Sequence, residues 1–167
     1  MAYTALGDYH KAHDRWLLLI TEFPVATHES GDYAEAAYTA FENADARQAM
    51  EILVTGMHRF PNDADFALRA GWIALLTDHG ERAYRFLLAG QQIGYRAEKF
   101  ENATAMLAVA ALQCDAKEDA SAYYANLVES NSAWKDAKAV EALDWPVELK
   151  SALESVRAST TLLAPTR

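Results

Sequence analysis

The chain has 167 residues, a length that suits one domain whose core needs no metal or disulfide support. Its residues are 51% hydrophobic and 23% charged, with only 7 glycines and 4 prolines, which excludes a disordered or collagen-like chain. The net charge of −9 argues against a general role in nucleic-acid binding, because phosphate contacts need a basic face.

Four helices are predicted in the first half of the chain, each bounded by turn residues. The first helix covers about residues 8–22 and the third about residues 46–59. The second begins after residues 30–32 and the fourth after residues 62–63. The first and third end before Pro24 and Pro61, since the residue before a proline is pushed out of the helical region. Ser30, Asp32 or Asp63 can cap the free N–H groups where the second and fourth helices begin.

Five more helices are predicted in the second half. They cover about 81–92, 97–113, 118–129 and 133–143, and a last helix begins at Trp145–Pro146, since proline is accepted in a first turn. Residues 159–167 are expected to form a flexible tail. Strand-like alternation of Val, Ile and Thr is missing, and the dominant residues are strong helix formers. The short breaks therefore predict an all-α fold of antiparallel hairpins, in one domain over 1–167.

The sequence shows no targeting or membrane segment. Nothing approaches the roughly 20 consecutive apolar residues of a spanning helix. The polar residues Asp8, His10, Lys11 and Asp14 precede the first apolar run, which is unlike a signal peptide. The one cysteine, Cys114, fits a reducing compartment. We therefore expect a cytoplasmic protein with no membrane insertion.

A period of 34 residues relates the second and third helices to the fourth and fifth, without any gap. Tyr33 falls on Ala67, and the remaining pairs are Ala36 and Ala70, Ala37 and Gly71, Ala40 and Ala74, Ala49 and Ala83, Leu53 and Leu87, and Gly56 and Gly90. Two helices approach closely only where the facing side chains are short, so these recurring small residues predict tight hairpins. A third unit keeps the spacing after a shift of three residues, with Ala108, Ala120, Tyr124 and Leu127.

This pattern resembles the tetratricopeptide repeat (TPR), whose period is 34 residues. The first full unit matches that repeat best, through Tyr33, Ala37, Ala49, Leu53, Gly56 and Pro61. The later units depart from it, since Tyr95 and Ser132 stand where the family has proline. The resemblance covers about residues 8–134 and implies a right-handed solenoid of about three units with flanking capping helices. A related array of helical hairpins outside the family would give a similar pattern.

In the resembled family, the first helix of each unit lines a concave groove that holds a peptide or helix of another protein. The corresponding positions here are Tyr38, Phe41 and Glu42, then Arg69, Trp72 and Leu76, and then Met106 and Val109. An apolar, partly aromatic groove of this kind favours a protein-binding module, an adaptor or a chaperone-like protein. The alternative is a structural subunit or homo-oligomer, in which the chain's own termini or a second copy fill the groove.

The sequence offers little for catalysis or metal binding. Phosphate loops, nucleophile elbows and dinucleotide fingerprints are missing, and Cys114 has no catalytic signature beside it. His10 and His13 share a helix face next to Asp14, but a third ligand at metal-binding spacing is lacking. We therefore predict no catalytic residue, no metal and no cofactor, with an enzyme on a helical scaffold as a further alternative.

One central band of the sequence is basic although the whole chain is acidic. Residues 67–100 hold five basic and three acidic side chains, a net charge of +2, whereas 33–66 and 101–134 each have a net charge of −4. Arg82 and Arg85 are expected on the outer side of a second helix. Such a band predicts either a docking surface for an acidic partner or attraction between neighbouring units.

Overall fold

The computed structural model describes residues 8–22 and 29–163. The helices are α2 (Tyr9–Glu22), α3 (Ser30–Glu42), α4 (Ala46–Arg59), α5 (Ala64–Leu76), α6 (Gly80–Ile93), α7 (Ala97–Gln113), α8 (Lys117–Ser130), the 3₁₀ helix η1 (Ser132–Lys135), α9 (Ala137–Glu141) and α10 (Val147–Leu163). Within those two ranges no strand occurs, so the predicted all-α fold is confirmed.

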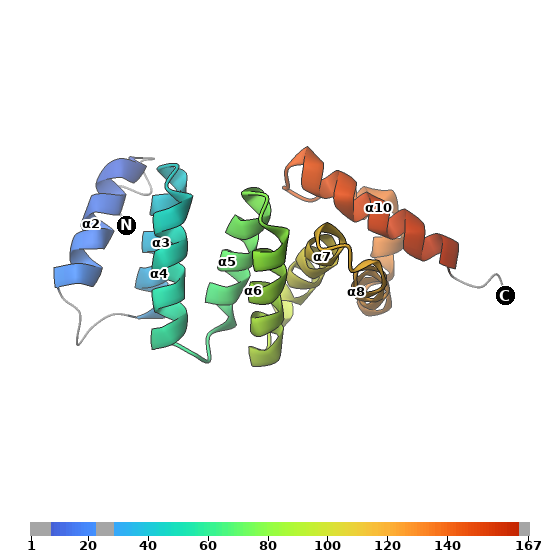
Figure 1. Ribbon diagram of the computed structural model, residues 1–167, viewed down its shortest axis with the longest axis horizontal. Coiled ribbons are helices and arrows are strands. Elements are labelled where there is room, and N and C mark those ends of the chain that lie inside the picture. Colours follow the sequence, from blue (N-terminus) through green and yellow to red (C-terminus); the bar gives the residue numbers. More distant parts are fainter. Residues whose placement is uncertain (1–7, 23–28, 164–167) are drawn as a thin grey trace.

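Consecutive helices pack as hairpins in a row. The pairs α3–α4, α5–α6 and α7–α8 have the most extensive contacts, and α2 packs against α3 at one end. Figure 1 shows the pairs side by side along an elongated array, from blue to yellow. At the other end of the row α10 lies across α7 and α8 (Figure 1). This arrangement is the helical-repeat architecture that the 34-residue period predicts.

The start of α3 differs from the predicted cap. Glu29, rather than Ser30 or Asp32, is the N-cap residue. Its backbone N–H donates to the Asp32 carboxylate at 3.0 Å, and its own carboxylate accepts from the Asp32 backbone N–H. Each carboxylate thus accepts from the otherwise unpaired backbone N–H of the other residue, as in a capping box. The predicted ranges of α4 and α7 match the structure.

The C-terminal helices also differ from the sequence prediction. Residues 133–143 do not form one helix, because Asp136 caps a new turn by accepting from the Lys138 backbone N–H at 3.0 Å. The segment is therefore split into η1 and α9. The last helix, α10, continues through Ser159 to Leu163, where a flexible tail was expected. Pro24 and residues 164–167 lie outside the described residues.

The recurring small residues lie where two helices approach most closely. A Cβ atom added to Gly71 of α5 would lie 2.5 Å from Cγ of Leu87 on α6, closer than real atoms pack. In the same hairpin Ala74 and Ala83 are buried. Tyr95 stands in this unit where proline was expected, and its hydroxyl donates to the Leu87 carbonyl at 2.6 Å. This hydrogen bond links the turn after α6 to the helix itself.

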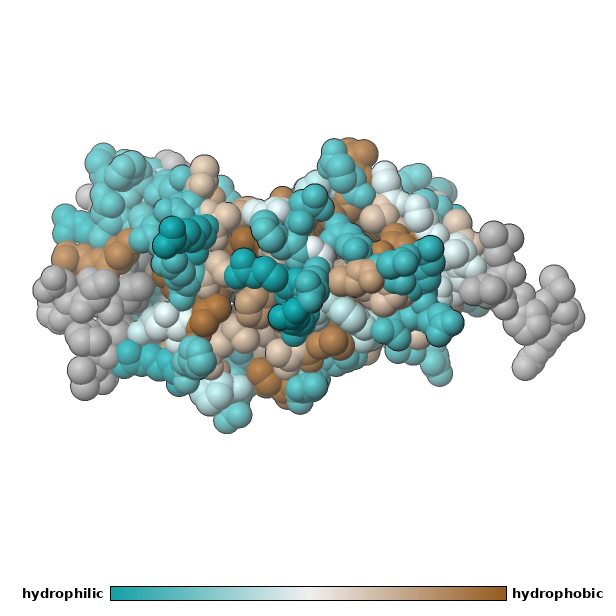
Figure 2. Space-filling model, in the orientation of Figure 1, coloured by the Kyte–Doolittle hydropathy of each residue, from teal (hydrophilic) through white to brown (hydrophobic). Residues whose placement is uncertain are grey.

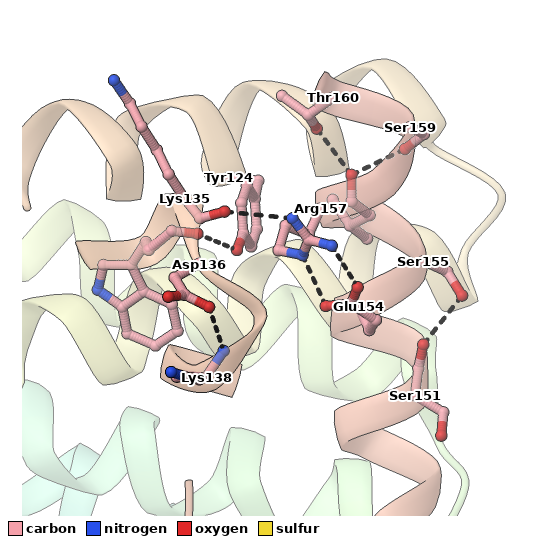
Figure 3. Close-up of polar contacts among 12 residues, drawn as sticks. Tyr124, Lys135, Asp136, Lys138, Ser151, Glu154, Ser155, Arg157, Ser159 and Thr160 are labelled. Atoms are coloured by element: carbon pink, nitrogen blue, oxygen red, sulfur yellow. Dashed lines mark hydrogen bonds and ion pairs between the residues drawn. The ribbon is translucent and has the colours of Figure 1, made fainter. Parts of the chain in front are cut away.

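The last hairpin is held by polar contacts to η1 and α10. The Tyr124 hydroxyl of α8 donates to the Trp134 carbonyl at 2.6 Å. Arg157 of α10 donates to the Lys135 carbonyl at 3.2 Å and pairs with Glu154 (Figure 3). The apolar side of α10 is buried through Leu149, Leu153 and Val156, which belong to the same core as α7 and α8.

Candidate functional site

The first helices of the first two hairpins line a cleft, called here the α3–α5 cleft. Its volume is about 120 Å³, and its lining includes Tyr38, Phe41 and Glu42 of α3 with Arg69 and Trp72 of α5. Tyr38 is 38% exposed, which is unusual for a large aromatic side chain in this structure. An aromatic cleft with one arginine has the residue types that protein interfaces use as anchors.

Helical periodicity places these side chains on the cleft side of α3. Ala36, Ala37 and Ala40 are buried and form the stripe that packs into the first hairpin. Tyr38 and Phe41 stand on a neighbouring stripe, three residues apart, so they project together beside α5. The same alternation of small, buried positions and large, accessible ones recurs on α5, where Gly71 is buried and Trp72 is half-buried.

Arg69 carries an unsatisfied polar group in this cleft. Its Nε atom is buried and has no hydrogen-bond partner among the described residues. Glu42 lines the same cleft, yet it forms no ion pair with Arg69 within the described ranges. Leaving a buried donor unpaired is unfavourable by about 1–3 kcal/mol. The atom itself is shielded from solvent, so a partner could reach it only after the Arg69 side chain moves.

A wider cleft of about 570 Å³ continues from α5 toward α7 and is bounded by the chain's own C-terminal segment. Arg69 and Trp72 line it together with Met106 and the turn that contains Leu143 and Trp145. The Trp145 ring packs on the Trp72 ring with centroids 5.4 Å apart and an interplanar angle of 46°. Trp145 is 9% exposed, so this end of the first-helix surface is filled by the chain itself.

The structure brings together most of the groove residues expected from the sequence. Tyr38, Phe41, Glu42, Arg69 and Trp72 all line the α3–α5 cleft. Leu76 is half-buried against the core and does not line that cleft.

The third-unit positions behave differently. Val109 is 0% exposed and belongs to the core, whereas Met106 is 4% exposed and only borders the wider cleft beside Trp145. The helix α10 packs against α7, and the Leu143–Trp145 turn lines the wider cleft together with Met106. The turn at Leu143–Trp145 was missed as part of the site, because it lies between helices and carries no helical periodicity.

Much of the basic band is paired within the array. Asp65 of α5 accepts from Arg96 at 2.5 Å and from Lys99 of α7 at 2.9 Å. Burial opposes ionisation of Asp65, but these hydrogen bonds outweigh it and lower the pKa of its carboxyl group. Arg85 pairs with Glu81 on α6. Three of the five basic side chains are thus paired internally, whereas Arg69 and Arg82 form no ion pair among the described residues, so both interpretations of the band stay open.

The candidate nucleophile and the candidate metal ligands are not assembled into a site. Burial raises the pKa of the half-buried Cys114 thiol, which favours its unreactive protonated form. His13 is 8% exposed, whereas His10 is exposed and lies 3.2 Å from Asp14. Among residues 8–22 and 29–163, no three His, Cys, Asp or Glu side chains form a metal-binding group. None of the helices in those ranges is long and apolar enough to cross a membrane.

Three stacked hairpins with a cleft between their first helices define a helical-repeat protein with a TPR-like fold. Among solved structures, the chain is similar to a thermophilic TPR protein of Thermus thermophilus, with a TM-score of 0.60. The match covers 96% of this chain and 77% of that chain, at 19% sequence identity, and so shows the fold. No family model and no curated protein matches the sequence.

Proposed function

We propose that this chain is a non-enzymatic protein-binding module, an adaptor or chaperone-like protein of the cytoplasm. The observation that supports this most directly is the aromatic α3–α5 cleft, where the 38% exposed Tyr38 lies beside Phe41, Arg69 and Trp72. A peptide or helix of another protein could place an apolar side chain between Tyr38 and Trp72 and an acceptor on Arg69. Binding would then cover exposed aromatic surface, which is one of the main sources of interface affinity.

Photo-crosslinking in the native host tests this proposal, because it captures whichever protein occupies the cleft. A photoreactive amino acid at Tyr38, which is 38% exposed, should yield a covalent adduct with a different protein of defined mass. Arg69→Ala should reduce the yield of that adduct. The matched control carries the same photoreactive group at Lys117 on α8, a position that is 75% exposed and remote from the cleft.

Two results would contradict the proposal. The same adducts from positions 38 and 117 would mean that capture does not depend on the cleft. An adduct of Tyr38 with a second copy of the chain would favour the alternative of a structural subunit or homo-oligomer. That alternative has one observation behind it, since Trp145 already fills the end of the first-helix surface next to Trp72.

A further inference from the structure

The second helices of the first two hairpins line another cleft, called here the α4–α6 cleft. Its volume is about 640 Å³. Met50 of α4 and Ile73 and Ala74 of α5 form a largely buried apolar floor. The lining runs along α4 from Ala46 to Thr55, about 14 Å at the rise of an α-helix. In Figure 2, pale to brown surface between α4 and α6 lies beside strongly hydrophilic side chains.

Two arginines and one histidine border this apolar floor. The lining includes Arg47 of α4, Arg82 of α6 and His79, with Glu51 as its acidic residue. Arg82 forms no ion pair in the part of the chain that the structure describes. Arg47 pairs with Glu51 at 3.0 Å, but these side chains are 89% and 63% exposed, so little free energy opposes an exchange of partners. The cleft thus offers two cations to an incoming carboxylate.

Two helices begin at the same edge of the cleft. The N-terminus of α4 is satisfied internally, since the Asp45 carboxylate accepts from the Gln48 backbone N–H at 2.9 Å. The N-cap residue of α6 is His79, whose side chain makes no capping hydrogen bond. Glu81, which pairs with Arg85, also lies in the first turn of α6, so the positive charge that α6 adds to this edge comes from Arg82.

We infer that the α4–α6 cleft is a second docking surface, which takes an acidic amphipathic helix of a partner protein. An apolar stripe of about two to three turns would cover the floor formed by Met50, Ile73 and Ala74. Carboxylates beside that stripe would reach Arg47 and Arg82. Because the whole chain has a net charge of −9, an acidic helix is repelled elsewhere, and these local cations determine where it docks. The inference does not depend on a partner in the α3–α5 cleft.

The probe is a fluorescein-labelled synthetic helix with one leucine face and one glutamate face, compared with a peptide in which glutamine replaces every glutamate. Fluorescence anisotropy should show that the acidic peptide binds and that its neutral glutamine counterpart binds more weakly. Arg82→Glu should weaken binding by roughly tenfold or more, since it replaces attraction by repulsion. Lys117→Glu makes the same charge change on α8, at a position 75% exposed, and should change the affinity by less than about twofold.

A second variant tests the apolar floor without changing charge. Thr55 is exposed on the cleft wall, so the Thr55→Trp variant should fold normally, which circular dichroism can verify. Its indole ring should obstruct the apolar floor and weaken binding of the acidic peptide. Backbone amide shifts in NMR spectra should change along α4 and α6. The inference would be overturned by equal binding of both peptides or by amide shifts centred on α3 and Trp72. Tighter binding of a single-stranded DNA oligonucleotide than of the acidic peptide would also overturn it. So would the absence of binding by the acidic peptide to the folded wild-type chain.

Discussion

Replacing Gly71 by alanine tests whether the small residues of the repeat are required by helix contact. The change adds one methyl group in the middle of α5. Intrinsic helix propensity alone predicts that it stabilises the protein by about 1 kcal/mol, because glycine is a poor helix former. The structure predicts the opposite sign, since the new Cβ atom would lie 2.5 Å from Cγ and 2.6 Å from Cδ2 of Leu87.

The magnitude follows from how little Leu87 can move. Its side chain is 0% exposed and packs in the core between the two helices of the hairpin. Overpacking of such a site is unfavourable by about 1–3 kcal/mol, and the upper end applies because neither backbone can retreat without disturbing the hairpin. After the gain in helix propensity is subtracted, we expect Gly71→Ala to lower the free energy of unfolding by about 1–2 kcal/mol.

Urea denaturation followed by circular dichroism measures this change. Gly31→Ala is the matched control, because a Cβ atom at that exposed position has nothing within 4 Å, and its stability should be unchanged or slightly higher. Leu87→Ala alone should destabilise by about 2–5 kcal/mol. The double variant should be more stable than the sum of the two effects predicts, since the added methyl group occupies space that Leu87 vacates. A Gly71→Ala protein more stable than the wild type would refute the reasoning.

Three further substitutions probe polar groups. Asp65→Asn should lower stability by roughly 1 kcal/mol at neutral pH, because it weakens the contacts with Arg96 and Lys99. Folding lowers the pKa of the Asp65 carboxyl group, so the difference in unfolding free energy between wild type and variant is fully present above the ordinary Asp pKa of 3.8. Urea denaturation at lower pH should show this difference disappear as the carboxylate is protonated. His13→Leu should raise the midpoint of thermal unfolding, because Nδ1 of the buried His13 has no partner among the described residues; a lower midpoint would contradict this. Tyr95→Phe should lower stability by about 1 kcal/mol in the same assay through loss of the hydrogen bond to the Leu87 carbonyl, and an unchanged midpoint would show that this bond contributes little.

The sequence predicts the hairpins well because their signals are local and repeated. A cap, a helical stripe of alanines and a break recur at the 34-residue period, and each signal is independent of the rest of the chain. The range of α4, whose N-cap is Asp45, was predicted to the residue for this reason, and the range of α7 was matched although its N-cap residue Arg96 makes no side-chain capping bond. The C-terminal segment follows no such period, so its division into η1 and α9 depended on the capping geometry of Asp136, which composition does not reveal.

The site shows where a repeat-based prediction fails. Trp72 and Val109 occupy equivalent places after the three-residue shift between units, yet the first is half-buried beside a cleft and the second is 0% exposed. The difference does not lie in the two helices themselves. The two helices have different neighbours: α10 packs against α7, whereas Trp145 of the C-terminal segment packs on Trp72 of α5. A resemblance carried over unit by unit assumes that every unit has the same neighbours, and the last unit of an array does not.

The helix α5 separates the α3–α5 cleft from the α4–α6 cleft, and this position bears on whether both could be occupied together. Ile73 is the one residue that lines both, and it is 6% exposed and fixed in the core. A ligand in either cleft therefore meets a wall that packing already holds in place, and little of its binding energy would be transmitted through α5. We accordingly expect binding at the two clefts to be independent, with the affinity of the acidic peptide for the α4–α6 cleft unchanged by Tyr38→Ala. Occupancy of both would let this short array hold two proteins on different sides of one helix, which is the arrangement that an adaptor requires.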